Sequence, residues 1–424
     1  MKNKRSGQSL VEVVIGLAIG AILMGTAAFA VTTMLRTNLT SEKSQFASQF
    51  AQSLSDNVRS YVVSNWESFY GLTKATSTHY FLNASGTTFF TVQGEEGLLD
   101  GDVPDGLVGH WKFDEVETTT STTTYDATGS GSHGTLTTGP TRASSTCKVA
   151  NCLNFDGVND YVDVPEATST LDVTSILTFS AWIYPTSSSS YKPILAKIPV
   201  AYGSGYEFAN SSGNFRTTLR TGSGNCDFTN GALTLNTWQH VASTYDGTTT
   251  RHYLNGALAS SSAACTYGAT ANDNDLYIGG RASDTSRFAG MIDDVRVYNR
   301  ALSSDEARQL YNSGIYERFF TIENVCRTND ASSTIASRAP CSGTVEDGST
   351  QWITNYVQWV TGGGTSEVKL SAIVARWQNA VFHQTDWSGG ASDEGAVAAP
   401  TGKFASSTNA STTGGAIQIQ NLSQ

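Results

Sequence analysis

The side chains that could carry out chemistry in this chain are carboxylates, and their spacing argues against catalysis. A retaining glycosidase needs two carboxyl groups about 5–5.5 Å apart, which on one strand takes an alternating run such as E-x-D-x-E. The nearest run is Asp114, Glu115, Val116 and Glu117, which leads into a loop rich in Thr and Ser. G-x-S-x-G, H-E-x-x-H and nucleotide-loop motifs are absent from the sequence. We therefore predict that the protein is not an enzyme.

Net charge and cysteine content restrict the partners and the compartment. The chain of 424 residues has a formal net charge of -11 and no Lys/Arg-rich tract beyond its first residues, so we expect no nucleic-acid partner. The six cysteines form no C-x-x-C motif, which favours disulfide bonds in an exported protein over a zinc site. Neighbours in the sequence are predicted to pair, although other connectivities are open: Cys147 with Cys152, Cys226 with Cys265, and Cys326 with Cys341.

The N-terminal segment places one acid at the start of an apolar stretch. A basic leader, MKNKRSG, comes first, and from Val13 to Val31 the chain has no charged side chain. A helix of this length spans the hydrocarbon core of a membrane. Glu12 lies at its beginning, where an ionisable group costs about 2.5 kcal/mol or more unless something pairs with it. We therefore expect a partner for Glu12.

The residues K-R-S-G followed by Q-S-L-V-E-V-V-I-G resemble the class III signal of type IV pilins and pseudopilins. The resemblance implies that a prepilin peptidase cuts after Gly7 and that the new amine on Gln8 is methylated, although the family usually has an aromatic residue or Met at that position. It also implies that Glu12 pairs with the free amine of a neighbouring subunit in the fibre core. The alternative is an ordinary secretory signal or membrane anchor, but the A-x-A-like site of a secretory signal does not follow the apolar stretch.

Beyond the apolar stretch the helical pattern continues and then changes to strands. Apolar residues recur every four positions, as in the half of a pilin helix that packs on the head: Phe46, Phe50, Leu54, Val58 and Val62. Four segments then show strand-like patterns between turn residues: HYFLNASGTTFFTVQGEEGLL, YERFFTIENVCR, STQWITNYVQWV and TSEVKLSAIVARW. They predict the antiparallel sheet of a pilin head, interrupted after its first segment by residues 105–313.

The interrupting block is itself rich in strand and turn signals. Phe179, Ala181 and Ile183 alternate with Ser180, Trp182 and Tyr184, as in a sandwich strand with one face on the core: LTFSAWIYP. Asp-Gly and Asn-Gly pairs supply the positive φ of hairpin turns. The ordered segments, among them CLNFDGVNDYVDVP, WQHVASTYDG and FAGMIDDVRVYNRALSSDEARQLY, resemble the concanavalin-like laminin-G jelly roll. The predicted fold is thus an α+β pilin, with a long N-terminal helix and an antiparallel head, that carries an inserted all-β jelly-roll sandwich.

Domains of that family often hold a structural calcium ion, and some bind glycans or proteins. The resemblance makes Asp114 and Asp293 the best calcium ligands, with Asp126 and Asp294 as reserves, since calcium takes several hard oxygens. These acids could instead cap turns or face solvent. Aromatic residues able to stack on sugar rings are Trp182, Tyr202 and Tyr206, although an aromatic residue in a β-sandwich is more often part of the core.

Together these features predict a minor or specialised type IV pilin-like filament subunit that displays a lectin-like module for adhesion to a glycan, protein or surface. The alternatives are a pseudopilin or structural filament component whose module contacts only other subunits, and a surface glycan-degrading enzyme. The subunit should pass once through the cytoplasmic membrane with its C-terminal head outside, and later lie in an extracellular pilus. The expected parts are a leader (1–7), a membrane and filament helix (8–64), the head (65–104 and 314–386), the jelly roll (105–313) and a flexible polar tail (387–424).

Overall fold

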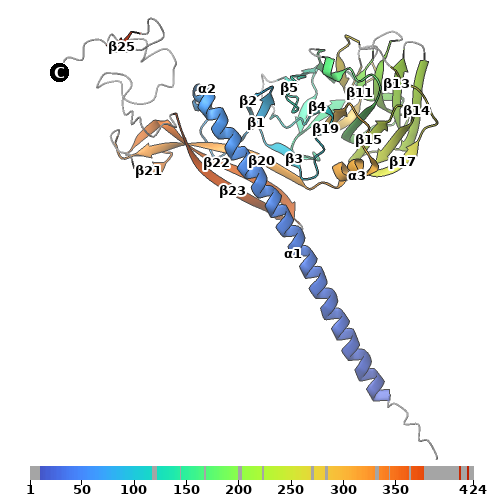
Figure 1. The fold of residues 1–424 in the computed structure, drawn as a ribbon, viewed down its shortest axis with the longest axis horizontal. Helices are drawn as coiled ribbons and strands as arrows, with labels where there is room; N and C mark the ends of the chain where they lie inside the picture. The colour runs from blue at the N-terminus through green and yellow to red at the C-terminus, as the bar shows by residue number, and fades with distance from the viewer. Residues whose placement is uncertain are drawn as a thin grey trace, which may run out of the picture. The chain divides into compact units, whose positions relative to one another are not determined.

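The computed structural model describes residues 10–376, except for short gaps, together with 410–411 and 418–419 (Figure 1). The gaps are 117–121, 144, 167–168, 199–202, 222–223, 269–271, 282–284, 330–333, 343 and 362–363. The leader, with Gly7 and Gln8, and almost all of the predicted tail lie outside the described residues, apart from the short pair β24 (Ala410–Ser411) and β25 (Gln418–Ile419). The chain divides into two compact units, within residues 1–49 and 50–424.

Helix α1 (Leu10–Ser64) contains the apolar stretch, and its first half leaves that stretch uncovered. Leu17, Phe29 and Met34 are 66–74% exposed. From Val14 onward the helix is long and apolar enough to cross a membrane, with a mean hydropathy of 2.3 and no buried residue in its most apolar window. A surface of this kind needs lipid or other apolar helices around it.

The end of α1 packs on an antiparallel sheet, here called the head sheet. Its order is β2-β1-β20-β22-β23, and β3 and β21 also pair with β20. Leu54, Val58 and Val62 of the predicted stripe are buried in one cluster with Phe320 and Ile353. The elements of this part are α2 (Trp66–Tyr70), β1 (Tyr80–Ser85), β2 (Thr88–Gln93), β3 (Glu96–Leu99), β20 (Ile315–Arg327), β21 (Ile335–Arg338), β22 (Val345–Thr361) and β23 (Gly364–Ala375).

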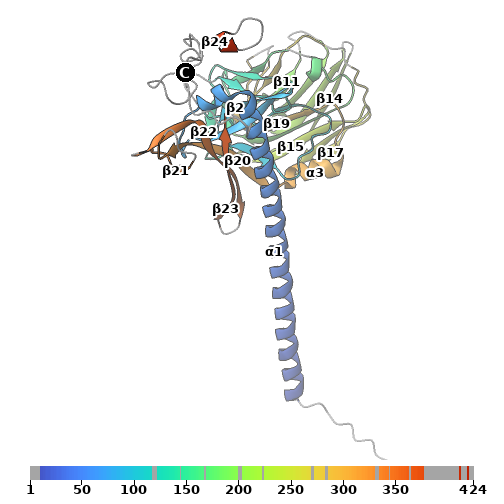
Figure 2. The same ribbon diagram turned by 60° about the vertical axis from the view of Figure 1, so that its left-hand side comes forward.

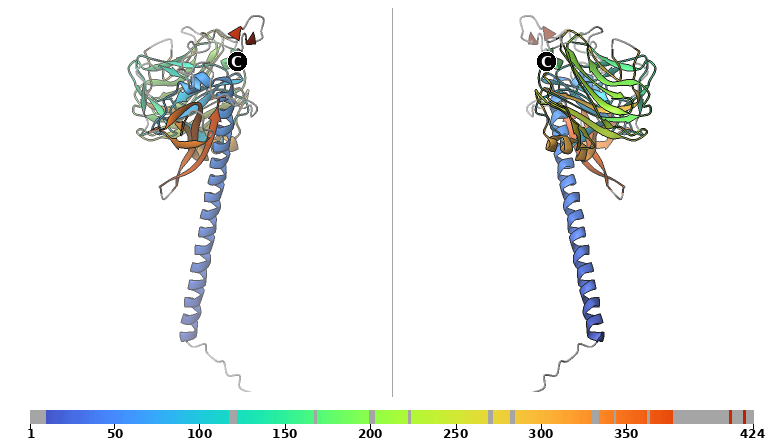
Figure 3. Two further views of the ribbon diagram at one scale, coloured as in Figure 1. Left: turned by 90° about the vertical axis from the view of Figure 1, so that its left-hand side faces the viewer. Right: turned by 90° about the vertical axis from the view of Figure 1, so that its right-hand side faces the viewer.

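Between β3 and β20 the inserted block forms two sheets of eight strands each among the described residues (Figures 2 and 3). The first sheet has the order β17-β16-β15-β10-β19-β8-β7, with β4 on β19: β4 (Leu107–Trp111), β7 (Thr141–Ala143), β8 (Cys152–Asp156), β10 (Leu177–Pro185), β15 (Gln239–Tyr245), β16 (Thr250–Leu254), β17 (Ala257–Ser261) and β19 (Ala289–Tyr298). The second has the order β14-β13-β12-β11-β18-β9-β6-β5: β5 (Thr123–Thr124), β6 (Gly134–Thr137), β9 (Tyr161–Val164), β11 (Tyr191–Lys197), β12 (Gly205–Ser211), β13 (Asn214–Thr221), β14 (Gly224–Ala232) and β18 (Leu276–Ile278). The short helix η1 (Ser169–Leu171) and α3 (Ser304–Asn312) complete the block.

Alternating apolar side chains from both sheets form one core between them. Phe179 of the first sheet stacks on Phe208 of the second, with ring centroids 4.4 Å apart. The predicted Asn255-Gly256 turn closes the β16–β17 hairpin with positive φ at both residues, 49° and 73°. The predicted α+β fold with an inserted β-sandwich is confirmed.

The structure contains three disulfide bonds, and each joins the neighbours that the sequence pairs: Cys147–Cys152, Cys226–Cys265 and Cys326–Cys341. Cys226 lies in β14, the edge strand of the second sheet, and Cys265 follows β17, the edge strand of the first. This bond therefore links the two sheets at their shared edge. A crosslink of this kind stabilises a domain by about 2–4 kcal/mol.

Strand β3 joins the head sheet to the block through buried polar contacts. Glu96 accepts hydrogen bonds from Lys112 of the block (2.8 Å) and from Arg318 of β20 (2.5 and 2.9 Å). A Cβ on Gly97 would lie 2.4 Å from Val149 Cγ1, so only glycine lets the strand come this close. The predicted boundary at residue 105 falls between β3 and β4. Glu96, which pairs with the buried Lys112 of the block, nevertheless comes before that boundary in the sequence.

Candidate functional site: the outer face of the second sheet

The outer face of the first sheet is covered around Trp182 by other parts of the same chain. Trp182, which points away from the sandwich core, is 3% exposed and packs in a cluster with Leu310 of α3 and Leu99 of β3. Its indole ring lies 5.6 Å from the Tyr311 ring and has the ammonium of Lys148 over it at 4.3 Å. The part of this face around Trp182 is therefore interior, whereas Tyr184, on the same side of β10, stays partly exposed beside Trp238.

The outer face of the second sheet instead carries half-buried tyrosine and arginine side chains. Along β12, Tyr206 and Phe208 enter the core, so Glu207 between them points to the other side. Register pairing places Tyr191 and Arg216 on that same outer side. We call this surface the Tyr–Arg face and define it by Tyr161, Tyr191, Glu207, Arg216, Tyr277, Arg281 and Arg287.

Cation–π contacts and one buried acid fix the geometry of the Tyr–Arg face. The guanidinium carbons of Arg281 and Arg216 lie 5.1 and 5.6 Å from the centroid of the Tyr191 ring. Glu207, only 1% exposed, accepts from Arg281 Nη1 at 3.4 Å. Burial, and then the neighbouring Glu207 carboxylate, raise the pKa of Tyr191 well above its ordinary value. Tyr191 therefore stays a neutral phenol at every physiological pH.

A second aromatic pair extends the same face along β9 and β18. The rings of Tyr161 and Tyr277 lie 5.7 Å apart, and the guanidinium carbon of Arg287 lies 4.8 Å from the Tyr161 centroid. Aromatic rings beside side chains with fixed donors and acceptors can hold a polyhydroxylated ring by stacking and by charge-assisted hydrogen bonds. The face has the chemistry to bind a sugar.

The aromatic residues singled out in the sequence are placed elsewhere. Trp182 is buried under α3, and Tyr206 is 1% exposed in the sandwich core, where its hydroxyl donates to the Leu171 carbonyl at 2.9 Å. Trp182 and Tyr206 are therefore buried packing residues, because neighbouring elements cover them. Tyr202 lies outside the described residues. Sequence reasoning missed Tyr161, Tyr191 and Tyr277, whose outward positions in β9, β11 and β18 are the available signal.

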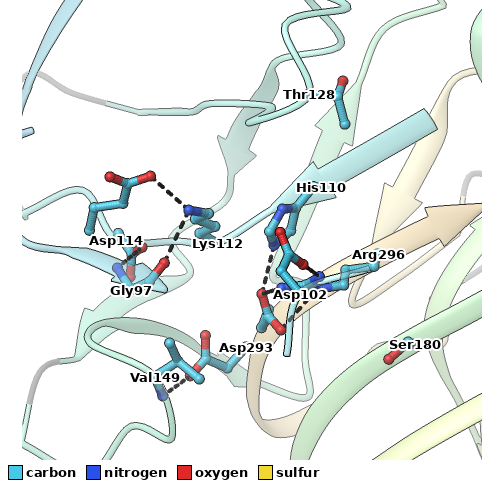
Figure 4. A network of polar contacts seen from close by, with 12 residues as sticks. Gly97, Asp102, His110, Lys112, Asp114, Thr128, Val149, Ser180, Asp293 and Arg296 are labelled. Atoms are coloured by element: carbon cyan, nitrogen blue, oxygen red, sulfur yellow. Dashed lines mark hydrogen bonds and ion pairs between the residues drawn. The ribbon is translucent and has the colours of Figure 1, made fainter. Parts of the chain in front are cut away.

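The two leading calcium candidates are buried carboxylates, and neither forms a direct ion pair within the described residues, although the Lys112 ammonium is near enough to Asp114 to lower its pKa (Figure 4). Asp114 Oδ2 accepts the backbone N–H of Gly97 at 2.7 Å. Asp293 Oδ2 accepts those of Val149 and Lys148 at 2.8 and 3.2 Å, while its Oδ1 is buried without a hydrogen-bond partner. Burial raises the pKa of each carboxyl well above its usual value, and the Asp114 charge adds to the rise at Asp293.

The two reserve candidates are already engaged. Asp126 accepts four hydrogen bonds, from the backbone N–H groups of His110 and Thr128 and from the Thr128 and Ser130 hydroxyls, at 2.6–3.1 Å. Asp294 binds Arg296 Nε at 3.0 Å and His110 Nε2 at 2.6 Å. Although burial raises it, Arg296 and His110 hold the pKa of Asp294 well below its ordinary value. Asp126 thus uses about all four lone-pair sites of its carboxylate, and the charge of Asp294 is already balanced by a guanidinium.

Asp114 and Asp293 therefore fit a calcium ion only as a pair. Within the described residues no group of three or more His, Cys, Asp or Glu side chains gathers around one point. Further oxygens would have to come from main-chain carbonyls or water, which calcium accepts. The partnerless Asp293 Oδ1 is the observation in favour of an ion.

The acids nearest to a catalytic run make structural contacts. Glu115 forms a buried ion pair with Arg142 and also accepts from the Tyr125 backbone N–H at 2.7 Å. Asp114 accepts a hydrogen bond from the backbone N–H of Gly97 in β3. Glu117 lies outside the described residues. The two described carboxylates thus bind groups of the protein and leave no pair open to a substrate.

Two known families match parts of this chain. Residues 156–308 match the concanavalin A-like lectin/glucanases superfamily, and residues 2–28 match the prokaryotic N-terminal methylation motif. The chain joins a prepilin-type N-terminus to a concanavalin-like domain. The matched range omits β4 to β8, which complete the concanavalin-like sandwich in the structure. No curated protein matches the sequence.

Solved structures show limited similarity to this chain. Domain 4 of AbnA, an extracellular arabinanase from Geobacillus stearothermophilus solved with arabinotriose, is 20% identical with a TM-score of 0.40, over 49% of this chain and 98% of that one. The binding domain of botulinum neurotoxin serotype D is 12% identical with a TM-score of 0.40, over 65% and 80%. Trypanosoma rangeli sialidase is 20% identical with a TM-score of 0.36, over 49% and 32%.

Proposed function

We propose that the protein is a minor or specialised type IV pilin-like subunit whose concanavalin-like domain binds a glycan through the Tyr–Arg face. The observation that carries this proposal is the difference between the two sheets. Helix α3 and strand β3 cover the outer face of the first sheet around Trp182, whereas the second sheet keeps Tyr191 half-buried beside two arginines and Tyr277 half-buried beside Tyr161. The prepilin-type helix supplies the anchor and the route to a filament.

The binding prediction concerns Tyr191 and Arg281. Replacing either by alanine removes a ring face or a charged donor from the Tyr–Arg face, and truncation of a central contact typically weakens binding about tenfold, or about 1.4 kcal/mol. Glycan-array binding by the full chain in detergent should fall accordingly. Tyr184→Ala, on the outer side of the first sheet beside Trp238, is the control and should bind like the parent.

The same array separates the alternatives. A module that only contacts other subunits gives no array signal and changes fibre number when Tyr191 is replaced. A glycan-degrading enzyme releases reducing sugar from a bound polysaccharide. Either result would overturn the glycan-binding proposal, and so would loss of binding in Tyr184→Ala alone.

The assembly prediction concerns Glu12. We propose that the peptidase cleaves after Gly7 and that Glu12 then pairs with the new amine on Gln8 of a neighbouring subunit. Glu12→Ala removes a charge from the membrane helix, so membrane insertion should persist or improve while the fibre count falls at least tenfold. Fractionation and electron microscopy measure both, and Glu42→Ala, at an exposed position of the same helix, should leave both unchanged. Unaltered fibre yield in Glu12→Ala would refute the pairing.

We also propose that Asp114 and Asp293 hold a structural calcium ion. What supports this is the charge arrangement, because the buried Asp114 carboxylate is close enough to raise the pKa of Asp293, and no described cationic side chain forms a direct ion pair with either acid. A bound divalent ion would supply the missing positive charge and order the Lys148–Val149 turn against β19. The ion would have no part in chemistry.

A further inference from the structure

Lys197, at the end of β11, is a fully buried lysine inside a shell of oxygen atoms. Its side chain is 0% exposed. Its ammonium lies 2.5 Å from Glu166 Oε2 and 3.1 Å from Asp172 Oδ1. It also donates to the main-chain carbonyls of Asn272 and Asn274, at 3.1 and 2.7 Å. Two carboxylates and two carbonyls thus meet at one buried point.

The charges at this point do not balance. Two carboxylates face one ammonium, and the ion pairs of the described residues give Glu166 and Asp172 no other cationic partner. Glu166 Oε1 is buried without a hydrogen-bond partner. An ammonium has three donors, fewer than the oxygens that surround it. The shell is one positive charge short.

Carboxylate and carbonyl oxygens are also the ligands of hard divalent cations. Calcium takes carboxylate and carbonyl oxygens and fills its remaining positions with water. We infer that the Lys197 ammonium occupies a calcium-type oxygen site, so that the chain supplies its own cation to loops that a metal would otherwise hold together. This inference is independent of the proposed ion at Asp114 and Asp293, which lie on other elements.

The site also positions part of the Tyr–Arg face. Asp275 Oδ1 accepts the Glu166 backbone N–H at 2.8 Å, and Asp275 directly precedes β18, which carries Tyr277. The loop that closes the lysine shell therefore sets the start of that strand. An internal ammonium would keep this part of the face ordered where free calcium is scarce.

Lys197→Ala in the full chain tests the inference, because it removes the ammonium and leaves space for an ion. In a chelator the variant should melt several degrees lower than the parent. Added calcium chloride should restore most of that loss, and terbium luminescence should report one more site than in the parent. Lys192→Ala, a partly exposed lysine of the same strand, controls for any calcium response elsewhere, including at Asp114 and Asp293.

Two further variants keep the test decisive. Glu166→Gln in the presence of Lys197 removes the excess negative charge, so its melting temperature should equal or exceed that of the parent. Lys197→Ala combined with Glu166→Gln should lose most of the calcium response. The inference fails if Lys197→Ala gains no more from calcium than Lys192→Ala, if it does not fold even with calcium, or if Glu166→Gln alone lowers the melting temperature by several degrees.

Discussion

Replacing Glu96 by alanine is expected to lower the free energy of unfolding of the head by about 3–5 kcal/mol, because it leaves two buried cations without a counter-charge. Lys112 and Arg318 both lose their carboxylate, and both are at least 85% buried in their side chains. Chemical denaturation of the full chain, followed by tryptophan fluorescence, measures the loss. Glu67→Ala, an exposed acid of α2, should change stability by no more than about 0.5 kcal/mol.

The reason for expecting so large an effect is the place of Glu96 between two parts of the chain. Arg318 belongs to the head sheet and Lys112 to the concanavalin-like domain, so one carboxylate holds both. We therefore also expect Glu96→Ala to separate the unfolding into two transitions. A single transition, shifted no further than in Glu67→Ala, would show that the triad does not couple the two parts.

The second large effect is expected from replacing Asp114 and Asp293 together by asparagine. Without calcium, the doubly substituted protein should be more stable than the parent at neutral pH, since two poorly solvated carboxylates become neutral amides of the same shape. With calcium at a hundredfold excess over its Kd, the parent should gain about 2.7 kcal/mol and the variant nothing. Thermal melting with a chelator and with calcium measures both differences. Asp305→Asn, on the exposed side of α3, should behave like the parent.

The expected dependence of stability on pH follows from the direction of the pKa shifts of Asp114 and Asp293. Burial raises the pKa of both carboxyls in the folded protein, so the folded state holds protons that the unfolded state has already released. Stability of the calcium-free parent should therefore fall as the pH rises from about 4, the ordinary value for Asp, through the raised folded values. Calcium should remove this fall, because it binds the ionised form. A parent whose stability is flat over this range and indifferent to calcium would exclude the metal site.

The elements themselves were predictable from the sequence because their signals are local. The four-residue spacing of Leu54, Val58 and Val62 marks one side of a helix whatever lies against it, and that side is buried on the head sheet. The Asn255-Gly256 pair marks a tight hairpin because few other residues adopt positive φ twice in succession. The order of strand and turn signals likewise indicated a sandwich inserted into an antiparallel head.

Only the tertiary structure determined which surfaces are covered and which charged side chains have partners. Alternation along β10 shows that Trp182 and Phe179 point to opposite sides, but α3 and β3, distant in sequence, determine that the Trp182 side is covered too. Asp114, Asp126, Asp293 and Asp294 are the same residue type, yet their surroundings differ. Asp294 is paired with Arg296 and with His110 from β4, Asp126 is held by backbone N–H groups and hydroxyls, and Asp293 keeps one buried oxygen without a hydrogen-bond partner. Lys197 meets oxygens from two loops that its own strand does not border in sequence. Burial and the pKa of a carboxyl depend on neighbours brought together by folding, and no spacing within one segment contains that information.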